Sequence, residues 1–171
     1  CLLVQGDTTT TMAASLAAFY QKIPVGHIEA GLRTYDKYAP YPEELNRRIT
    51  SVIAEYNFAP TEWAKDNLIK EGISKDKIYV TGNTVVDALR SAMEKVRVSG
   101  LQNKFNKMFD FLDKEKRLVL ITGHRRESFG DGFINICTAI KELALKFQAC
   151  EFLYPVHLNP NVQSPVKEIL G

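Results

Sequence analysis

The sequence predicts an α/β fold made of two Rossmann-like, doubly wound parallel-sheet domains that face each other across a cleft. Short apolar runs alternate with helical patterns along the chain, which is typical of parallel sheets joined by crossover helices. Near residues 84–116, two helical patterns follow each other without a strand between them and separate an earlier block from a later one. Four of the apolar runs stop at an ionisable residue, as expected of strands that lead into a ligand site.

The first block combines four expected strands with three expected helices. The strands are 2–5, 24–28, 56–59 and 77–81, and the helices are 9–21, 43–55 and 61–71. Helix 9–21 is apolar or small nearly all round, which suits close packing between a sheet and another layer. Helix 43–55 has an apolar stripe at helical spacing that we expect to face inward: Leu45, Ile49, Val52, Ile53 and Tyr56.

A helical bridge and a shorter second block follow. Helices are expected near 84–96 and 101–113, then strand 117–122, helix 132–147, strand 151–156 and helix 164–170. We assign residues 1–83 to the C-terminal part of the first domain, 84–116 to the bridge and 117–171 to the first part of the second domain. Because the chain opens on a strand without Met and stops at a helix end, we expect an internal fragment in which both domains are incomplete.

The composition argues against several classes of protein. A hydrophobic content of 45% and a charged content of 25% are ordinary for a soluble globular protein. The net charge of +2, without a basic run, argues against a nucleic-acid partner, and no stretch approaches the roughly 20 apolar residues of a membrane span. The three cysteines have no C-x-x-C spacing, so we expect neither a disulfide framework nor a zinc site, and a reducing cytoplasm as the compartment.

The turn after the first strand carries Asp7 and leads directly into a helix. Thr8 or Thr9 can cap that helix, and the unpaired backbone N–H groups at its start can hold an anion. The alternative is that Asp7 is itself part of the cap. This segment alone supports both interpretations equally.

Two further carboxylates lie in the first block. Glu29 follows a strand and is flanked by glycines, which let a ligand approach the backbone closely, but a Glu29–Arg33 ion pair is a plain alternative. Glu43 lies in the first turn of a helix, where the helix dipole favours acids, and it is spaced to pair with Arg47. On spacing alone, the structural role is the stronger interpretation for Glu43.

All three histidines lie at the ends of strands, and two of these are in the second block. His124 opens the loop to Gly132, which also holds Arg125 and Arg126 for phosphate oxygens. A histidine buried in the core is the usual alternative for a lone His, but the cluster of His and two Arg at a strand end favours a functional site. His157 repeats the strand-end position in the next unit, between prolines that stiffen its loop.

Missing motifs narrow the chemistry further. The glycines never form G-x-G-x-x-G, no Asp-x-Asp or histidine spacing suggests a metal site, and no G-x-S-x-G turn is present. We therefore expect no cofactor and no metal. The remaining candidates are three carboxylates and a histidine beside a loop suited to phosphate. These side chains are the kinds of group that act in general acid/base catalysis.

Six motifs in order closely resemble those of the bacterial non-hydrolysing UDP-N-acetylglucosamine 2-epimerases, and the resemblance runs almost end to end. The motifs are Gly-Asp-Thr-Thr-Thr-Thr at 6–11, Gly-His-Ile-Glu-Ala-Gly-Leu-Arg-Thr at 26–34, Pro-Glu-Glu-Leu-Asn-Arg-Arg at 42–48, Val-Thr-Gly-Asn-Thr-Val-Val-Asp at 80–87, Thr-Gly-His-Arg-Arg-Glu at 122–127 and Tyr-Pro-Val-His-Leu-Asn-Pro-Asn-Val at 154–162. The resemblance implies the two-domain GT-B architecture and a cytoplasmic homodimer. The product it implies is UDP-N-acetylmannosamine, a precursor of cell-surface polysaccharide.

The resemblance also implies a mechanism and roles for residues. The family expels UDP to form a glycal intermediate, adds UDP back and protonates C2 from the opposite face. Asp7, Glu29 and Glu43 match the catalytic carboxylates, and His124 matches the active-site histidine. Asp7, Glu29 and His124 are also expected to bind substrate. Arg125 and His157 match positions that bind a second, regulatory UDP-sugar.

The chain also departs from the family pattern. Family members have a strand-helix-strand block before position 1 that contacts the nucleotide, and a Ser/Gly-rich helix start after position 171 that holds the diphosphate. Three alternatives stay open: a hydrolysing epimerase that releases N-acetylmannosamine, a GT-B glycosyltransferase and a non-catalytic UDP-sugar-binding protein. Product analysis, isotope uptake at C2 and turnover distinguish them.

Overall fold

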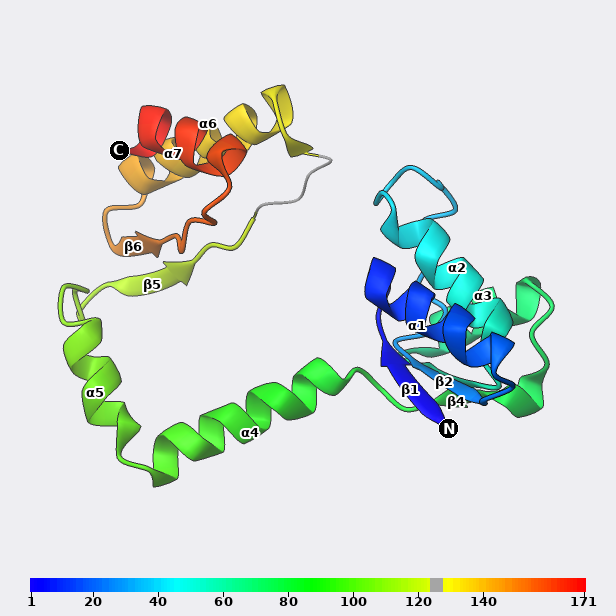
Figure 1. Cartoon of the computed structure of the whole chain (residues 1–171). Helices are drawn as coiled ribbons and strands as arrows, with labels where there is room; N and C mark the ends of the chain where they lie inside the picture. Colours follow the sequence, from blue (N-terminus) through cyan, green and yellow to red (C-terminus); the bar gives the residue numbers. More distant parts are fainter. Residues whose placement is uncertain (124–127) are drawn as a thin grey trace. The chain divides into compact units, whose positions relative to one another are not determined.

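A computed structural model describes residues 1–123 and 128–171, which form two compact units, 1–95 and 96–171 (Figure 1). Each unit is built on a parallel sheet, of four strands in the first and two in the second, so the predicted α/β class is confirmed. The limit between the units falls inside helix α4 (Thr84–Val98). The finer division into 1–83, 84–116 and 117–171 stays a prediction.

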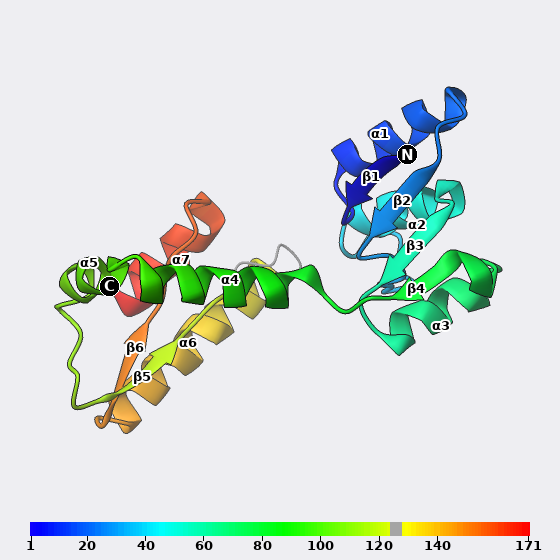
Figure 2. The ribbon, with the colours of Figure 1, turned by 90° about the horizontal axis from the view of Figure 1, so that it is seen from below.

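The strands of the first unit lie side by side in chain order. The elements are β1 (Leu2–Gln5), α1 (Thr9–Tyr20), β2 (Val25–Ile28), α2 (Glu43–Ile53), β3 (Tyr56–Ala59), α3 (Glu62–Lys70), a 3-10 turn (Lys75–Lys77) and β4 (Ile78–Val80). Right-handed crossovers that all advance in one direction place their helices on one face of the sheet, as Figures 1 and 2 show for α1, α2 and α3.

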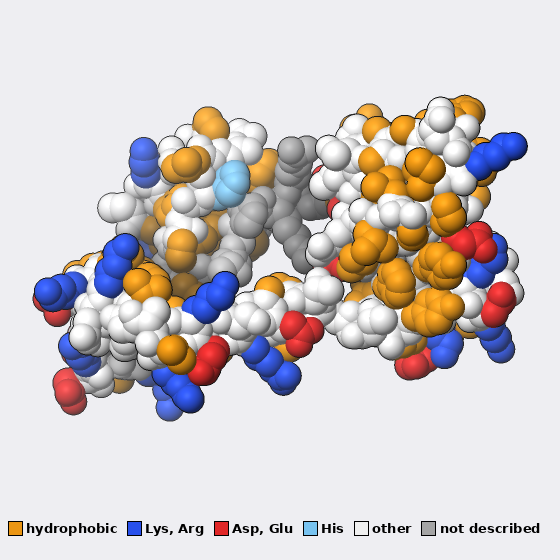
Figure 3. Space-filling model, turned by 60° about the horizontal axis from the view of Figure 1, so that its bottom comes forward, with side chains coloured by type: hydrophobic (Ala, Val, Ile, Leu, Met, Phe, Trp, Pro, Cys, Tyr) orange, Lys and Arg blue, Asp and Glu red, His pale blue; other side chains and the backbone are white. Residues whose placement is uncertain are grey.

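Side chains alternate between the two faces of this sheet. On the helix side, Val4 and Val25 pack with Ala18 and Ala54 in a buried cluster. The opposite face is also apolar but is exposed in this chain, and Figure 3 shows apolar side chains gathered on the surface of the first unit. The strand residues of that face include Leu3, Tyr56, Phe58 and Tyr79, the last in ring contact with Tyr56 and Phe58.

The inward face of α2 is largely polar, so the expected apolar stripe is wrong for Leu45 and Val52, whereas Ile53 does pack against the buried cluster of Val4 and Val25. Leu45 is 48% and Val52 is 77% exposed. The buried residues of this helix are instead Glu44, Asn46, Arg47, Thr50 and Ser51. Their burial is tolerated because each of them has a hydrogen-bond or ion-pair partner inside the fold.

The second unit is smaller. Its elements are α5 (Leu101–Met108), β5 (Arg117–Leu120), α6 (Asp131–Lys146), β6 (Cys150–Leu153) and α7 (Pro160–Leu170). Phe133, Cys137 and Val162 form its buried cluster, whereas Ile136 of α6 is exposed.

Helix α7 begins four residues before its predicted start. Asn159 caps it by accepting a hydrogen bond from the Asn161 N–H at 2.9 Å, and Pro160 occupies the first helical position. An Asn-Pro pair is a start signal for a helix because proline needs no partner for an N–H there.

Across the described ranges, no helix has both the length and the apolar character of a membrane span.

Replacing Gly31 with alanine should destabilise the first unit more than the same change at Gly72. Both glycines have a left-handed backbone, with φ of +86° and +87°, so the strain of about 1–2 kcal/mol from that conformation is common to both. A Cβ at Gly31 would also overlap the Ala64 carbonyl group of α3, whereas a Cβ at Gly72 meets nothing within 4 Å. Overpacking should add about 1–3 kcal/mol at Gly31 alone. Chemical unfolding measures both losses, and equal losses would contradict the tight packing of Gly31 on α3.

Candidate functional site

Asp7 and Glu29 lie at the same edge of the first sheet. β1 and β2 are parallel neighbours, and the Gly6 N–H donates to the Ile28 carbonyl at 3.0 Å just beyond their ends. A Cβ built on Gly6 would lie 3.4 Å from Glu29 Oε2, so the Glu29 carboxylate lies against the turn that carries Asp7. The structure thus brings these two predicted site residues together at the carboxyl ends of adjacent strands.

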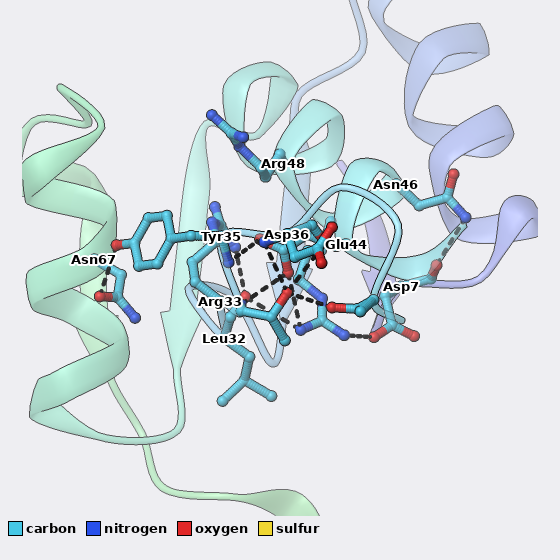
Figure 4. Close-up of polar contacts among 12 residues, drawn as sticks. Asp7, Leu32, Arg33, Tyr35, Asp36, Glu44, Asn46, Arg48 and Asn67 are labelled. Carbon is cyan, nitrogen blue, oxygen red and sulfur yellow. Dashed lines mark hydrogen bonds and ion pairs between the residues drawn. The ribbon is translucent and has the colours of Figure 1, made fainter. Parts of the chain in front are cut away.

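Side chains from α2 hold the Asp7 turn from the other side (Figure 4). The Arg47 guanidinium pairs with Asp7 Oδ2, and Asn46 Nδ2 donates to the Asp7 carbonyl at 2.9 Å. The cap of α1 is Thr8, whose hydroxyl accepts from the Thr11 N–H at 3.2 Å. The interpretation of Asp7 as part of the helix cap is therefore wrong, since its carboxylate faces Arg47.

The two adjacent acids at the start of α2 have different surroundings. Glu44 is fully buried and accepts from the backbone N–H groups of Thr34 and Tyr35 at 3.1 and 3.2 Å, so it fixes the loop that precedes the helix. Glu43 is only half-buried, and its carboxylate has no hydrogen bond or ion pair to any residue within 1–123 and 128–171. The expected Glu43–Arg47 pair is not formed, because Arg47 pairs with Asp7 and, at 3.5 Å, with Glu44.

The expected Glu29–Arg33 pair is not formed either. Arg33 is buried and makes a two-pronged ion pair with Glu71, with N–O distances of 3.0 and 2.7 Å. The structure gives the Glu29 carboxylate no partner among the described residues. Glu29 also has φ of +67°, which is uncommon for a residue with a side chain and is found where a site imposes strain. Both features favour a functional role for Glu29 over a structural one.

His27 is a buried residue to which the sequence assigned no role. Its Nε2 lies 2.8 Å from the Gly6 carbonyl oxygen and its Nδ1 lies 3.4 Å from Ser51 Oγ. Burial lowers the pKa of His27 to about 4, against an opposing effect of the hydrogen bond to Gly6. The ring is therefore neutral at neutral pH and cannot be a proton store for catalysis there.

The sequence also missed Glu44 and Arg47. A signal for them was present, because Glu44, Arg47 and Ser51 are spaced by three and four residues and share one helical face. The sequence of α2 therefore has two faces, one polar and one apolar, that could each lie against the sheet. Helical spacing by itself does not say which of two stripes is buried.

The remaining predicted site residues belong to the second unit. His124 and Arg125 lie outside the described residues. His157 follows β6 as expected and is exposed, and its Nδ1 accepts a hydrogen bond from the Asn159 N–H at 3.1 Å. This contact ties the His157 ring to Asn159, the residue that caps α7. In the described part of the chain, no group of three or more His, Cys, Asp or Glu side chains is arranged to hold a metal ion.

Comparison with known proteins identifies similar sequences over the whole chain. The profile of the family described as UDP-N-acetylglucosamine 2-epimerase matches residues 1–171. A UDP-N-acetylglucosamine 2-epimerase of Neisseria meningitidis serogroup A is 55% identical over 171 residues, which cover 100% of this chain and 46% of the relative. One of Escherichia coli K12 is 53% identical, over 99% of this chain and 46% of the relative. The chain thus spans about half the length of these curated relatives.

Solved structures agree with that result. The Neisseria meningitidis epimerase bound to UDP-GlcNAc superimposes with a TM-score of 0.95 at 55% identity, covering 99% of this chain and 46% of that one. The Methanocaldococcus jannaschii epimerase in complex with UDP-GlcNAc and UDP has a TM-score of 0.72 at 34% identity, covering 98% and 44%.

Glu44→Gln should destabilise the protein, whereas Glu43→Gln should not. The Glu44 carboxylate is fully buried between two backbone donors and Arg47, and weakening these bonds should lower the free energy of unfolding by about 1–3 kcal/mol. Glu43 has no such partners in the described ranges, so its loss should stay within about 0.5 kcal/mol. Urea titration of both variants is the measurement. Equal losses would refute the division of roles between the two neighbours.

Stability should fall as the pH falls from 6.5 toward about 4. The folded chain holds the pKa of His27 at about 4 while the unfolded chain has the ordinary 6.5, so the unfolded state binds more protons in this window. The contribution of the neutral His27 ring to the free energy of unfolding is complete above pH 6.5, and about 3 kcal/mol of this contribution is lost by pH 4. The control is His27→Gln, in which this term is absent. A difference between the two proteins that does not shrink on acidification would contradict the shift.

Proposed function

We propose that this chain, which belongs to the UDP-N-acetylglucosamine 2-epimerase family, is the part of a non-hydrolysing epimerase that carries its acid/base carboxylates. The reaction would interconvert UDP-N-acetylglucosamine and UDP-N-acetylmannosamine. The observation that carries the proposal is the meeting of Asp7 and Glu29 at one sheet edge, in a chain that matches the family along its whole length. The Neisseria relative was solved with UDP-GlcNAc bound, which supports this substrate class.

The proposed chemistry is elimination followed by addition. The C2 hydrogen of the sugar is not next to a carbonyl, so a base alone removes it poorly. In the first half-reaction the C1–O bond breaks and its electron pair leaves with UDP, a carboxylate takes the C2 proton, and a C1–C2 double bond forms. In the second half-reaction UDP adds back at C1 and a carboxylic acid on the opposite face gives a proton to C2. No oxidant is consumed, so no redox cofactor is required.

Three carboxylates are available for two faces. Asp7 is fixed by Arg47 and Asn46, whereas Glu29 and Glu43 have no partner among the described residues. Groups that must exchange protons with a substrate benefit from a fixed position and an unoccupied lone pair. We therefore assign the acid/base work to Asp7, Glu29 and Glu43, without allotting a face to each.

We assign the leaving diphosphate and the regulatory ligand to the second unit. His124 is proposed to act in catalysis and substrate binding, since the sequence His-Arg-Arg after a predicted strand offers positive charge that suits the departing UDP. Arg125 and the exposed His157 are proposed to bind a second UDP-sugar, and the structure of the Methanocaldococcus relative in complex with UDP-GlcNAc and UDP supports recognition of both ligands. A cytoplasmic homodimer is part of the same proposal.

A protein of full family length that contains this sequence should be incubated with UDP-N-acetylglucosamine in D2O and followed by NMR. The expected result is UDP-N-acetylmannosamine with deuterium at C2. Release of free N-acetylmannosamine would identify a hydrolysing epimerase instead. Transfer to an acceptor without isotope at C2 would identify a glycosyltransferase, and binding without turnover would identify a sensor.

Asp7→Asn should lower turnover by about 10²-fold or more in the same protein while KM changes only a few-fold, as for loss of an acid/base group. Asp66→Asn is the control, because Asp66 is an exposed aspartate on α3. Unfolding curves should show that both variants are folded. Turnover of Asp7→Asn within a few-fold of the unmodified protein would reduce Asp7 to an ion-pair partner of Arg47.

A further inference from the structure

We propose that His27 is a positioning residue that fixes the Asp7 turn relative to Glu29, through a buried chain of hydrogen bonds that begins at Glu71. The proposal rests on the proposed function, because it concerns two carboxylates assigned to acid/base work there. His27 does not contact substrate in this proposal. It acts through the backbone of Gly6.

The hydrogen-bond chain crosses the first unit from α3 to the edge of the sheet. Glu71 holds Arg33 by two bonds, and Arg33 NH2 donates to Ser51 Oγ at 3.2 Å. Ser51 Oγ lies 3.4 Å from His27 Nδ1, and His27 Nε2 lies 2.8 Å from the Gly6 carbonyl oxygen. Arg33, Ser51 and His27 are all buried, so water does not compete for these bonds.

Both ends of the chain require the same tautomer of His27. A guanidinium can only donate, so Ser51 accepts from Arg33 and its own proton is available for His27 Nδ1. A backbone carbonyl can only accept, so His27 Nε2 must carry the hydrogen that bonds to Gly6. The neutral Nε2–H ring satisfies every group. The low pKa of His27, caused mainly by burial, agrees with this neutral form.

The bond from His27 closes a clamp on Gly6. The Gly6 N–H donates to the Ile28 carbonyl at 3.0 Å while the Gly6 carbonyl accepts from His27, so neighbouring residues of β2 hold both sides of Gly6. Asp7 is the next residue after Gly6, and Glu29 is the next residue after Ile28. The spacing between the two carboxylates is therefore set by one short stretch of β2.

An apolar side chain would fill the same space without this function. A residue that only packs in the core needs no partner at either ring nitrogen, whereas His27 has one at each. Displacement of a catalytic group by about 1 Å costs on the order of 10²-fold in rate. Loss of the clamp should therefore appear in kcat and leave KM nearly unchanged.

Two amide variants of the full-length protein test the donor. His27→Gln can place an N–H donor where Nε2 lies, whereas the shorter His27→Asn reaches only the Nδ1 position. We expect His27→Gln to keep kcat within about 10-fold and His27→Asn to lose about 10²-fold, with KM within a few-fold for both. Equal kcat values in the two variants, or a loss that appears in KM instead, would overturn the proposal.

The serine in the middle of the chain provides a matched test. Ser51→Ala removes the donor to His27 Nδ1. Ser15→Ala is the control, since Ser15 is an equally buried serine whose hydroxyl, among the described residues, bonds only to the Thr11 carbonyl of its own helix. We expect a lower kcat for Ser51→Ala and little change for Ser15→Ala at similar stability. The same loss in both would reduce the effect to packing.

Nitrogen NMR of the histidine rings tests the chain without reference to turnover. In the labelled full-length protein at neutral pH, His27 should carry its proton on Nε2. In Ser51→Ala the proton should stay there, because the Gly6 carbonyl still accepts from Nε2, while the Nδ1 resonance should shift as it loses its donor. A proton on Nδ1 in the unmodified protein would overturn the proposal. This readout needs no substrate, so it tests the positioning role independently of the proposed epimerase activity. Failure of that activity would instead be seen when the unmodified protein is incubated with UDP-N-acetylglucosamine.

Discussion

The ion pairs of Arg47 connect the segments on which the site of the first unit depends. Its guanidinium pairs with Asp7 after β1, lies 3.5 Å from Glu44 at the start of α2, and donates to the Leu32 carbonyl at 3.3 Å beyond β2 (Figure 4). One cation thus joins two strand ends to a helix. Guanidinium suits this position because it offers five donors in a fixed plane.

This arrangement explains why the inward face of α2 is polar. A buried charge without a partner costs several kcal/mol, so Glu44 and Arg47 can be buried only together with the groups they bond. Replacement of such a network by apolar residues is often neutral or stabilising, so stability alone does not account for it. The network does specify where the Asp7 turn and the loop after Glu29 lie.

The same network divides the acidic residues of the first unit by role. Glu44 and Glu71 form bonds within the fold: Glu44 accepts from backbone N–H groups, and Glu71 pairs with Arg33. Glu29 and Glu43 are left without a partner among the residues the structure describes. The carboxylates at the adjacent positions 43 and 44 therefore have different surroundings: Glu44 holds a loop, and Glu43 has no bonded partner in the described ranges.

The sequence by itself determined the α/β class, the order of the elements and the strand-end positions of Asp7, Glu29 and His157. These follow from local patterns, because strand and helix periods and turn residues are properties of short stretches. The start of α7 was also local, in the pair Asn159 and Pro160, but was overlooked.

Only the tertiary structure decided which stripe of α2 is buried and which acid pairs with which base. Residues 7 and 47, or 33 and 71, are distant in the chain, and their pairing requires the register of the sheet and the packing of α2 and α3 on it. The sequence proposed the nearest opposite charge for Glu29 and for Glu43, which is the choice that local spacing favours. Folding instead matched each arginine to the carboxylates buried beside it, because a charge removed from water must be paired where it lies.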